Sequence, residues 1–401
     1  KKTIDEKSFE PFIPDYINLS SYKKNGGYEI ANKIRNGVIS KKQVLDSLNE
    51  SGLKGKGGAG FPTGKKWEIV SNYNGKKYVA VNGDEGEPGT FKDRSYLESD
   101  PHRFLEGALI ASYFINAHKV YIYMRDEYPT VIKILLDEIN KMEDEEIIPK
   151  DFFIVRRGAG AYICGEESAM IESIEGKRGL PRHRPPYVAE IGLFGCPTLT
   201  NNLETLFWVR DIIEKGAKWF AEKGSNGNKG FHSFSVSGRV KNPGVKVAPA
   251  GITIQQLIDE YCDGMADGHT FKGYLPGGAS GGILPATMND IPLDYGSKEL
   301  MDAGCFLGSA AVVVLSDHDN MKDVALNLLK FFEEESCGQC TPCRSGTEKT
   351  VKLMQEKNWN KEKLKDLSEV MAQASICGLG QAATNPLNSV LKYFSNEITY
   401  D

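Results

Sequence analysis

Four cysteines near the end of the chain constrain its fold more than any other feature of the sequence. Cys337, Cys340 and Cys343 have C-x-x-C-x-x-C spacing, which is expected to place them on a tight loop, and Cys377 follows on a separate segment. Three clustered thiolates completed by a distant fourth suit a [4Fe–4S] cluster, which takes four cysteine ligands. A structural zinc site or a set of disulfides is the alternative, although zinc sites more often use two separate C-x-x-C pairs. The fold must therefore hold two segments around one point.

Composition narrows the class of protein further. The chain has 401 residues, 40% of them hydrophobic, and a net charge of −5. This length allows roughly two to four domains with a substantial core. The charge gives no reason to expect a nucleic-acid partner. No stretch reaches the roughly 18 apolar residues of a membrane span, and the first residues resemble no secretory signal.

The remaining cysteines indicate the redox environment. Cys164, Cys196, Cys262 and Cys305 are scattered along the chain. Scattered cysteines are more often buried thiols than halves of disulfides. The sequence therefore predicts a reducing compartment and a cytoplasmic location.

The middle of the chain predicts a parallel α/β layer. Hydrophobic strands at 77–81, 119–124 and 152–156 alternate with helical segments at 102–117 and 129–142. Alternation of this kind is typical of parallel strands joined by helices.

Glycines and carboxylates follow two of these strands. Asn82-Gly-Asp-Glu-Gly-Glu-Pro-Gly89 follows the first strand, and the segment from Gly158 to Glu167 follows the third. Open α/β sheets bind ligands at the carboxyl ends of their strands. Carboxylates there can accept hydrogen bonds from ribose hydroxyls or from a heterocycle N–H, and they repel a ribose 2′-phosphate. A solvated acidic turn is the alternative.

Another glycine-rich stretch, Gly55 to Gly60, precedes the layer. It matches G-x-G-x-x-G, but a helix rather than a strand comes before it, so it is no Rossmann fingerprint. Such a loop still lets backbone amides approach a phosphate or a flat ring. Lys56, Lys65 and Lys66 add positive charge. A flexible surface loop with solvated lysines is the alternative.

The rest of the chain predicts an extended arm and two further modules. The arm covers residues 1–27, and Thr200 to Thr205 has the pattern of an N-capped helix start. Paired strands, a helix and two later strands form a small α+β module, and helices from Asp319 onward form a bundle that clamps both cysteine segments. The expected domains are 1–68 (arm, short helices and glycine-rich loop), 69–228 (nucleotide-binding α/β domain), 229–318 (β-grasp-like domain) and 319–401 (helical cluster domain).

Five motifs in this order carry a family resemblance. They are Gly55-Lys-Gly-Gly-Ala-Gly-Phe-Pro-Thr-Gly64, Asn82-Gly-Asp-Glu-Gly-Glu-Pro-Gly89, Gly160-Ala-Tyr-Ile-Cys-Gly-Glu-Glu167, Thr200-Asn-Asn202 and Glu335-Ser-Cys-Gly-Gln-Cys-Thr-Pro-Cys343. Together they resemble the NADH-binding flavoprotein subunit of respiratory complex I and its soluble relatives. Those relatives are the diaphorase subunits of NAD-linked hydrogenases and formate dehydrogenases.

The resemblance implies a fold, cofactors and partners. The fold is an FMN-binding Rossmann-like α/β domain, then a ubiquitin-like (β-grasp) α+β domain, then a helical bundle that holds the cluster. The cofactors are FMN, NAD(H) and one [4Fe–4S] cluster. The implied partners are an iron–sulfur subunit, of the thioredoxin-like [2Fe–2S] kind, and a larger redox subunit.

The resemblance also implies which residues bind each group, and none of them acts as an acid or base. Those implied to hold FMN are Gly55, Lys56, Gly57, Gly58, Lys66, Asn82, Asp84, Glu85, Gly165, Glu166, Asn201, Asn202 and Thr205. Those implied to face the dinucleotide are Phe61, Glu87, Tyr162, Glu167 and Tyr187, and Lys66 touches both ligands. The cluster ligands are Cys337, Cys340, Cys343 and Cys377.

Two departures from the family pattern stand out. Lys54 and Lys56 replace arginines, so that a bidentate guanidinium becomes a point charge. The segment from Ile376 to Pro386 is more similar to the soluble hydrogenase and formate dehydrogenase branch than to the respiratory one.

The predicted function is an NADH-oxidising, or reversibly NAD⁺-reducing, subunit of an oxidoreductase complex. Hydride passes between NADH and FMN, and single electrons pass to the cluster and on to a partner. Two alternatives stay open: an electron-transfer or assembly scaffold without flavin chemistry, and a flavoprotein linked to ferredoxin instead of NADH.

Overall fold

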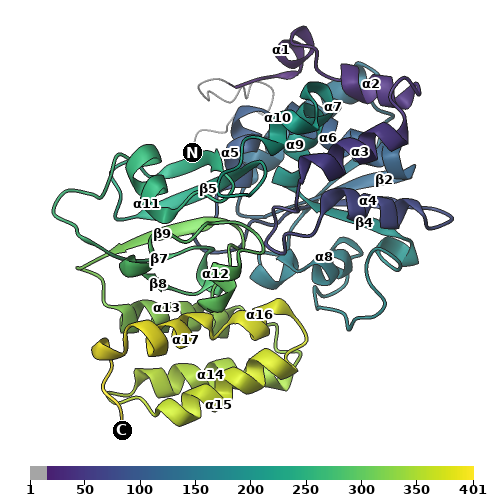
Figure 1. Cartoon of the computed structure of the whole chain (residues 1–401). Coiled ribbons are helices and arrows are strands. Elements are labelled where there is room, and N and C mark those ends of the chain that lie inside the picture. The colour runs from purple at the N-terminus through teal and green to yellow at the C-terminus, as the bar shows by residue number, and fades with distance from the viewer. Residues whose placement is uncertain (1–15) are drawn as a thin grey trace, which may run out of the picture.

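A parallel sheet, a mixed sheet and a helical bundle make up the part of the chain that the structure describes, residues 16–401 of a computed structural model (Figure 1). In Figure 1 the α/β domain, purple to teal, lies above the green mixed sheet and the yellow bundle. Most of the predicted arm, residues 1–15, lies outside the described residues.

The parallel sheet has the strand order β3-β2-β1-β4. Its strands are β1 (Tyr78–Gly83), β2 (Lys119–Met124), β3 (Phe153–Arg157) and β4 (Thr198–Asn202). The chain runs outward from β1 to β3 and then returns to add β4 on the other side of β1. Strands β1 and β4 therefore form a topological switch point, where open α/β sheets bind ligands at the carboxyl ends. This arrangement confirms the predicted Rossmann-like class.

Helices cover this sheet because their sequences carry long apolar faces. They are α6 (Pro101–Ile115), α7 (Pro129–Asp144), α8 (Glu167–Ile174) and α9 (Leu203–Lys215). The shorter α5 (Lys92–Ser99) packs against α6, α7 and α9. The Asp100 side chain caps α6 by accepting a hydrogen bond from Arg103 N at 3.2 Å, and Pro101 occupies the first turn. Helix α6 packs closely on α9, since a Cβ at Gly107 would lie 1.9 Å from the Leu206 carbonyl oxygen.

Within residues 16–77, four short helices precede β1. They are α1 (Leu19–Lys24), α2 (Glu29–Arg35), α3 (Lys41–Ser51) and α4 (Thr63–Ser71). Ser40 forms a capping box with Gln43 at the start of α3. The predicted extended arm is wrong over α1. That segment is helical because Leu19 and Tyr22 are buried against the domain, and the Tyr22 hydroxyl donates to Glu106 at 2.6 Å.

The mixed sheet has the order β6-β5-β9-β7-β8. Its strands are β5 (Phe231–Gly238), β6 (Gly244–Pro249), β7 (Phe271–Leu275), β8 (Leu284–Pro285) and β9 (Ala311–Ser316). Strand β5 pairs antiparallel with β6 and parallel with the distant β9. One face of the sheet shares its own hydrophobic core with helix α11 and the turn that continues it (Ile254–Tyr261).

The bundle follows β9 directly. Its helices are α13 (Met321–Glu334), α14 (Thr341–Gln355), α15 (Lys361–Ala374), α16 (Gly378–Ala382) and α17 (Asn385–Tyr393). Apolar faces of these helices share one core with the loop after β3 and helix α8. Within residues 16–401, no helix is long and apolar enough to cross a lipid bilayer.

Two local predictions need correction. The segment from Thr200 to Asn202 was expected to begin a helix, but it forms the end of strand β4, because it pairs in parallel with β1. Helix α9 begins at Leu203, and the Asn202 side chain does not cap it. In the cluster region, Cys343 lies in the first turn of α14 and not on a loop.

Candidate functional site

Polar side chains from the two switch-point strands meet beyond the carboxyl ends of β1 and β4, which is the position of the ligand crevice in open α/β sheets. Asn82 on β1 and Asn202 on β4 are register partners, and Asp84 follows β1. Asn82 Nδ2 donates to the Gly165 carbonyl at 2.8 Å, which fixes the loop after β3 against the end of β1. Motifs far apart in the sequence therefore lie on one edge of the sheet.

The glycine-rich loop closes over this edge. Lys56 N donates to Thr205 Oγ1 at 2.8 Å, and Gly55 N donates to the Phe61 carbonyl at 2.8 Å. A Cβ at Gly57 would lie 3.1 Å from Asn202 Cβ, so the backbone passes directly beside that side chain. The loop is thus held as a backbone wall of the crevice.

Two buried oxygens in the crevice have no hydrogen-bond partner among the described residues. They are Asp84 Oδ2 and Asn202 Oδ1. Burial raises the pKa of Asp84 to about 7, against the opposing charge of Arg125. Buried polar atoms are normally paired. Unpaired acceptors at a switch point fit a polar heterocycle that presents an N–H group, as the isoalloxazine ring of FMN does.

Lys66 and Glu167 face each other across the crevice mouth. Lys66 Nζ lies 3.0 Å from Glu167 Oε2, and both side chains are half-buried. Trp67 Nε1 donates to Asn201 Oδ1 at 2.9 Å and thereby fixes α4 on β4. Lys66 is the fourth residue of α4, and a helix N-terminus with a lysine nearby suits a phosphate.

The Lys56 side chain points away from the crevice. Its ammonium donates to the Phe231 carbonyl at 2.6 Å and lies 2.9 Å from His232 Nδ1. His232 Nε2 lies 2.6 Å from Asp294, whose other oxygen pairs with Lys54 at 3.1 Å. Burial lowers the pKa of Lys56 to about 8. The two lysines that replace arginines thus anchor the loop on the mixed-sheet domain, and a phosphate contact from Lys56 remains a prediction.

Two carboxylates that were predicted to bind FMN accept hydrogen bonds from backbone amides at the first turns of helices. Glu85 accepts hydrogen bonds from Asp93 N at 2.7 Å and Arg94 N at 3.2 Å, in the first turn of α5. Glu166 caps α8 by accepting from Ser168 N at 3.0 Å. Both residues hold the frame of the crevice in this way, and direct contact of either side chain with a ligand remains a prediction.

Glu87 joins three parts of the molecule. Its carboxylate accepts a short hydrogen bond from the Tyr162 hydroxyl, and bonds from Ser280 N at 2.9 Å and Ser280 Oγ at 2.7 Å. Burial raises the pKa of Glu87, and these hydrogen bonds oppose the rise. Gly278 has φ +80°, and a Cβ there would lie 2.7 Å from Glu87 Cγ, so the chain passes close to this carboxylate.

Two predicted aromatic residues are unusually exposed. Phe61 is 47% exposed and Tyr187 is 59% exposed. Exposed flat rings are available for base stacking, which is the role that the family resemblance implies for both residues.

Lys92, a buried lysine beneath the crevice, was not predicted from the sequence as a functional residue. Lys92 Nζ lies 2.9 Å from Asp93 Oδ1 and 2.8 Å from Glu204 Oε2, and all three side chains are buried. Asp93 also accepts from Asn202 Nδ2 at 2.8 Å, which positions a predicted flavin contact. No local signal marks these residues, because Lys92-Asp93-Arg94 has the composition of an exposed helix start.

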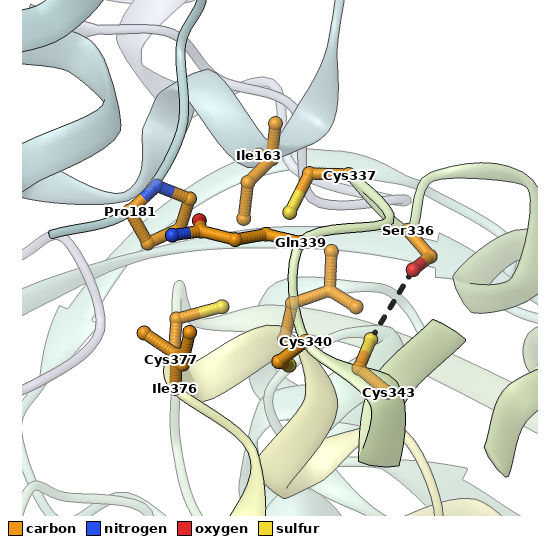
Figure 2. A pocket seen from close by; sticks show the side chains of 10 residues that line it. Ile163, Pro181, Ser336, Cys337, Gln339, Cys340, Cys343, Ile376 and Cys377 are labelled. Atoms are coloured by element: carbon orange, nitrogen blue, oxygen red, sulfur yellow. Dashed lines mark hydrogen bonds between the residues drawn. The ribbon is translucent and has the colours of Figure 1, made fainter. Parts of the chain in front are cut away.

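The four motif cysteines line a single pocket. Figure 2 shows Cys337, Cys340, Cys343 and Cys377 around it, with Ser336 hydrogen-bonded to Cys343. All are free thiols, which argues against the disulfide alternative. Cys340 is the N-cap residue of α14, where the helix dipole favours thiolates. Burial raises the pKa of the Cys343 thiol to about 11, a cost that bound iron would remove. The donor set fits a four-cysteine cluster.

One loop contacts both sites. In the loop from Gly158 to Glu167, Gly165 bonds the end of β1 and Tyr162 bonds Glu87. Tyr162 N donates to Glu335 Oε2 at 3.0 Å on the cysteine side, and the adjacent Ile163 lines the cysteine pocket (Figure 2). The crevice and the cysteine pocket are therefore neighbours.

One loop joins the crevice at the switch point to the four-cysteine pocket. This arrangement is that of an electron-transfer flavoprotein with an iron–sulfur cluster. Residues 48–211 match the Nuo51 FMN-binding domain, and residues 323–401 match the NADH-ubiquinone oxidoreductase-F iron-sulfur binding region. The chain belongs to the family of NADH-quinone oxidoreductase F subunits.

Curated relatives match over nearly the whole chain. In Rhizobium meliloti, the NADH-quinone oxidoreductase F subunit that is numbered 2 is 40% identical over 96% of this chain and 94% of the relative. The NADH-quinone oxidoreductase F subunit of Aquifex aeolicus is 39% identical over 96% of this chain and 91% of the relative.

A solved structure has the same fold. The air-oxidized NAD⁺-reducing [NiFe]-hydrogenase matches with a TM-score of 0.85 and 31% identity, over 98% of this chain and 69% of the hydrogenase chain. These findings confirm the predicted oxidoreductase class, FMN, the [4Fe–4S] cluster and electron exchange with NAD(H), and they imply partner subunits. The cytoplasmic location and the identities of the partners remain predictions.

Proposed function

We propose that the crevice between β1 and β4 holds FMN, that NAD(H) binds over it, and that electrons pass through the cysteine pocket to a partner. When bound, FMN supplies hydride exchange with NADH and one-electron exchange with a cluster. The observation that carries the proposal is the loop from Gly158 to Glu167, because it forms a wall of both sites.

The chain's own residues would hold the flavin mainly through polar groups left open in the crevice. Asp84 and Asn202 present unpaired oxygens to ring N–H groups. Backbone amides of Gly57 and Gly58 would face the phosphate and ribityl chain, with the Lys66 ammonium beside them, and Gly55 would hold the loop in place through its bond to Phe61. Asn82, Asn201 and Thr205 position the walls through the contacts already described.

The dinucleotide would bind at the outer side of the crevice. Phe61 and Tyr187 would stack on its rings, since both are exposed. Glu87 and Glu167 would accept hydrogen bonds from ribose hydroxyls, and Tyr162 would hold Glu87 in place. Carboxylates there repel a 2′-phosphate, which favours NADH over NADPH.

Anaerobic addition of NADH to the holoprotein tests the proposal. The flavin absorbance should bleach, and a reduced-cluster signal should then appear in electron paramagnetic resonance. A flavin that stays oxidised with NADH but bleaches with reduced ferredoxin would contradict the NADH site. A purified protein that contains the cluster but no flavin would contradict the FMN site and would favour an electron-transfer scaffold.

We expect Phe61→Ala and Tyr187→Ala to raise KM for NADH with little change in kcat. Stacking of a base on an aromatic ring is worth about 1–3 kcal/mol, so each KM should rise roughly 5- to 150-fold. Steady-state rates with an artificial acceptor measure the effect. Phe194→Ala is the matched control, because Phe194 is also exposed but lies outside the predicted set. Equal KM values for NADH in all three variants would contradict the proposal that Phe61 and Tyr187 stack on the dinucleotide.

Affinity for FMN should rise with pH up to about 7 and then level off. Burial raises the pKa of Asp84 to about 7, and a ring N–H would favour the ionised carboxylate. Binding would therefore release a proton below that pH, with a slope of at most about tenfold per pH unit. Fluorescence titration of the apoprotein with FMN measures this.

Asp84→Asn tests the origin of that pH dependence. The variant should bind FMN more weakly, by about 1.5–3 kcal/mol, and without the slope, because its amide does not titrate. Asp46→Asn is the control, since Asp46 pairs with Lys42 on the surface of α3. If the slope persists in Asp84→Asn, another group causes it.

Two finer assignments belong to the same proposal. The electron-accepting partners would be a thioredoxin-like [2Fe–2S] subunit and a larger redox subunit, because no second cysteine cluster site occurs within residues 16–401. Free thiols throughout that region favour a reducing, cytoplasmic compartment.

A further inference from the structure

Two histidines and an aspartate gather at the edge of the mixed sheet, away from the cysteine pocket. The ligand atoms of His269, Asp317 and His318 all lie within 4.8 Å of one another. His269 precedes β7, and Asp317 and His318 follow β9, so the paired strands bring them together. The two imidazole centroids are 4.5 Å apart.

Hydrogen bonds hold this group while leaving a ligand atom free on each residue. Asp317 N donates to the Thr270 carbonyl at 3.0 Å, and Thr270 N donates to Asp317 Oδ1 at 2.9 Å. The second carboxylate oxygen, Oδ2, remains available. His269 Nδ1 lies 2.9 Å from Ser316 Oγ, which leaves Nε2 available. Metal-binding histidines usually have their second ring nitrogen engaged in this way.

Neighbouring cations are already neutralised. Arg239 Nη2 pairs with Asp319 Oδ1 at 2.7 Å. Lys272 Nζ pairs with Glu397 at 2.8 Å and donates to the Asp319 carbonyl at 2.6 Å. A divalent cation bound by the three side chains would therefore contact the Asp317 carboxylate, and the charges of Arg239 and Lys272 would not repel it because both are already paired.

We propose that His269 Nε2, Asp317 Oδ2 and a ring nitrogen of His318 bind one Zn²⁺ ion, with water completing the shell. Imidazole and carboxylate ligands suit zinc, at about 2.0–2.2 Å. Asp317 and His318 are exposed, so rotation of their side chains can draw the three ligand atoms together. The ion would fasten the start of β7 to the turn between β9 and α13. This site would be independent of the electron-transfer site.

Zinc titration of the holoprotein, kept anaerobic so that the cluster occupies its cysteines, tests the proposal. Calorimetry should show one saturable Zn²⁺ per chain, and zinc X-ray absorption should show only nitrogen and oxygen neighbours. Asp317→Asn and His318→Gln should each weaken binding at least about tenfold. Asp317→Asn is informative because an asparagine Oδ1 can still accept the Thr270 hydrogen bond.

His118→Gln is the matched control, because His118 is an exposed histidine on the α/β domain. It should bind zinc as the unmodified protein does. Three results would overturn the site: no saturable zinc binding, sulfur neighbours at about 2.3 Å in the absorption spectrum, or unchanged binding in the His269→Gln/His318→Gln double variant.

Discussion

Cys340→Ala is expected to lose the iron–sulfur cluster while the flavin still exchanges hydride with NADH. Cys340 lines the pocket beside Cys337, Cys343 and Cys377, and a [4Fe–4S] cluster needs four ligands. Iron and acid-labile sulfide per flavin should fall to near zero. One-electron delivery to a partner should fall with them, because the predicted exit path runs through this pocket.

Two readouts separate loss of the cluster from loss of the fold. Anaerobic NADH should still bleach the flavin of Cys340→Ala, since Cys340 makes no contact with the crevice between β1 and β4 in the interactions described above. Cys196→Ala is the matched control, because Cys196 is a free, half-buried thiol outside the pocket. It should keep its iron.

The iron content of the same variant tests which residues are the cluster ligands. Iron at the level of the unmodified protein in Cys340→Ala would show that the assignment of Cys340 as a ligand is wrong.

The parallel sheet was predictable because its two central strands, β1 and β2, are buried on both faces. Hydrophobic runs such as Val79–Val81 and Val120–Met124 signal such strands directly. Strand β4 gave no such signal, since Thr198–Asn202 is polar and borders a helix. Its pairing with β1 is a tertiary effect, and so the switch point could not be located from the sequence.

The site was predictable as a set of motifs but not as a set of contacts. Glycines and carboxylates after strands indicate a nucleotide crevice. The sequence cannot show that the Lys56 ammonium turns toward His232, or that Glu166 caps α8. The Lys56 orientation depends on residues of the mixed-sheet domain, and Glu166 gives no capping signal because Ser, Thr, Asp and Asn are the preferred N-cap residues.

Lys92 is another residue whose contacts could not be predicted from the sequence, and its substitution is expected to cause the largest loss of stability. We expect Lys92→Met to destabilise the α/β domain by about 3–5 kcal/mol, the usual cost of breaking a buried ion pair on one side. Methionine keeps the length of the side chain but leaves Asp93 and Glu204 without their cation. Urea denaturation followed by flavin release and circular dichroism measures the change. Lys330→Met, on the exposed face of α13, should stay within about 0.5 kcal/mol.

The pH dependence of that loss identifies its cause. In the unmodified protein burial raises the pKa of Glu204, but Lys92 and the other partners outweigh burial and hold it below its usual value. Without Lys92, burial should dominate and raise the folded-state pKa above that of the unfolded chain. Stability is then retained at low pH and lost as pH rises. The loss in the free energy of unfolding that Lys92→Met causes should therefore be smaller at pH 5 than at pH 8. Adding Glu204→Gln to Lys92→Met should restore part of that free energy. A deficit that is constant with pH would point instead to a packing defect around residue 92.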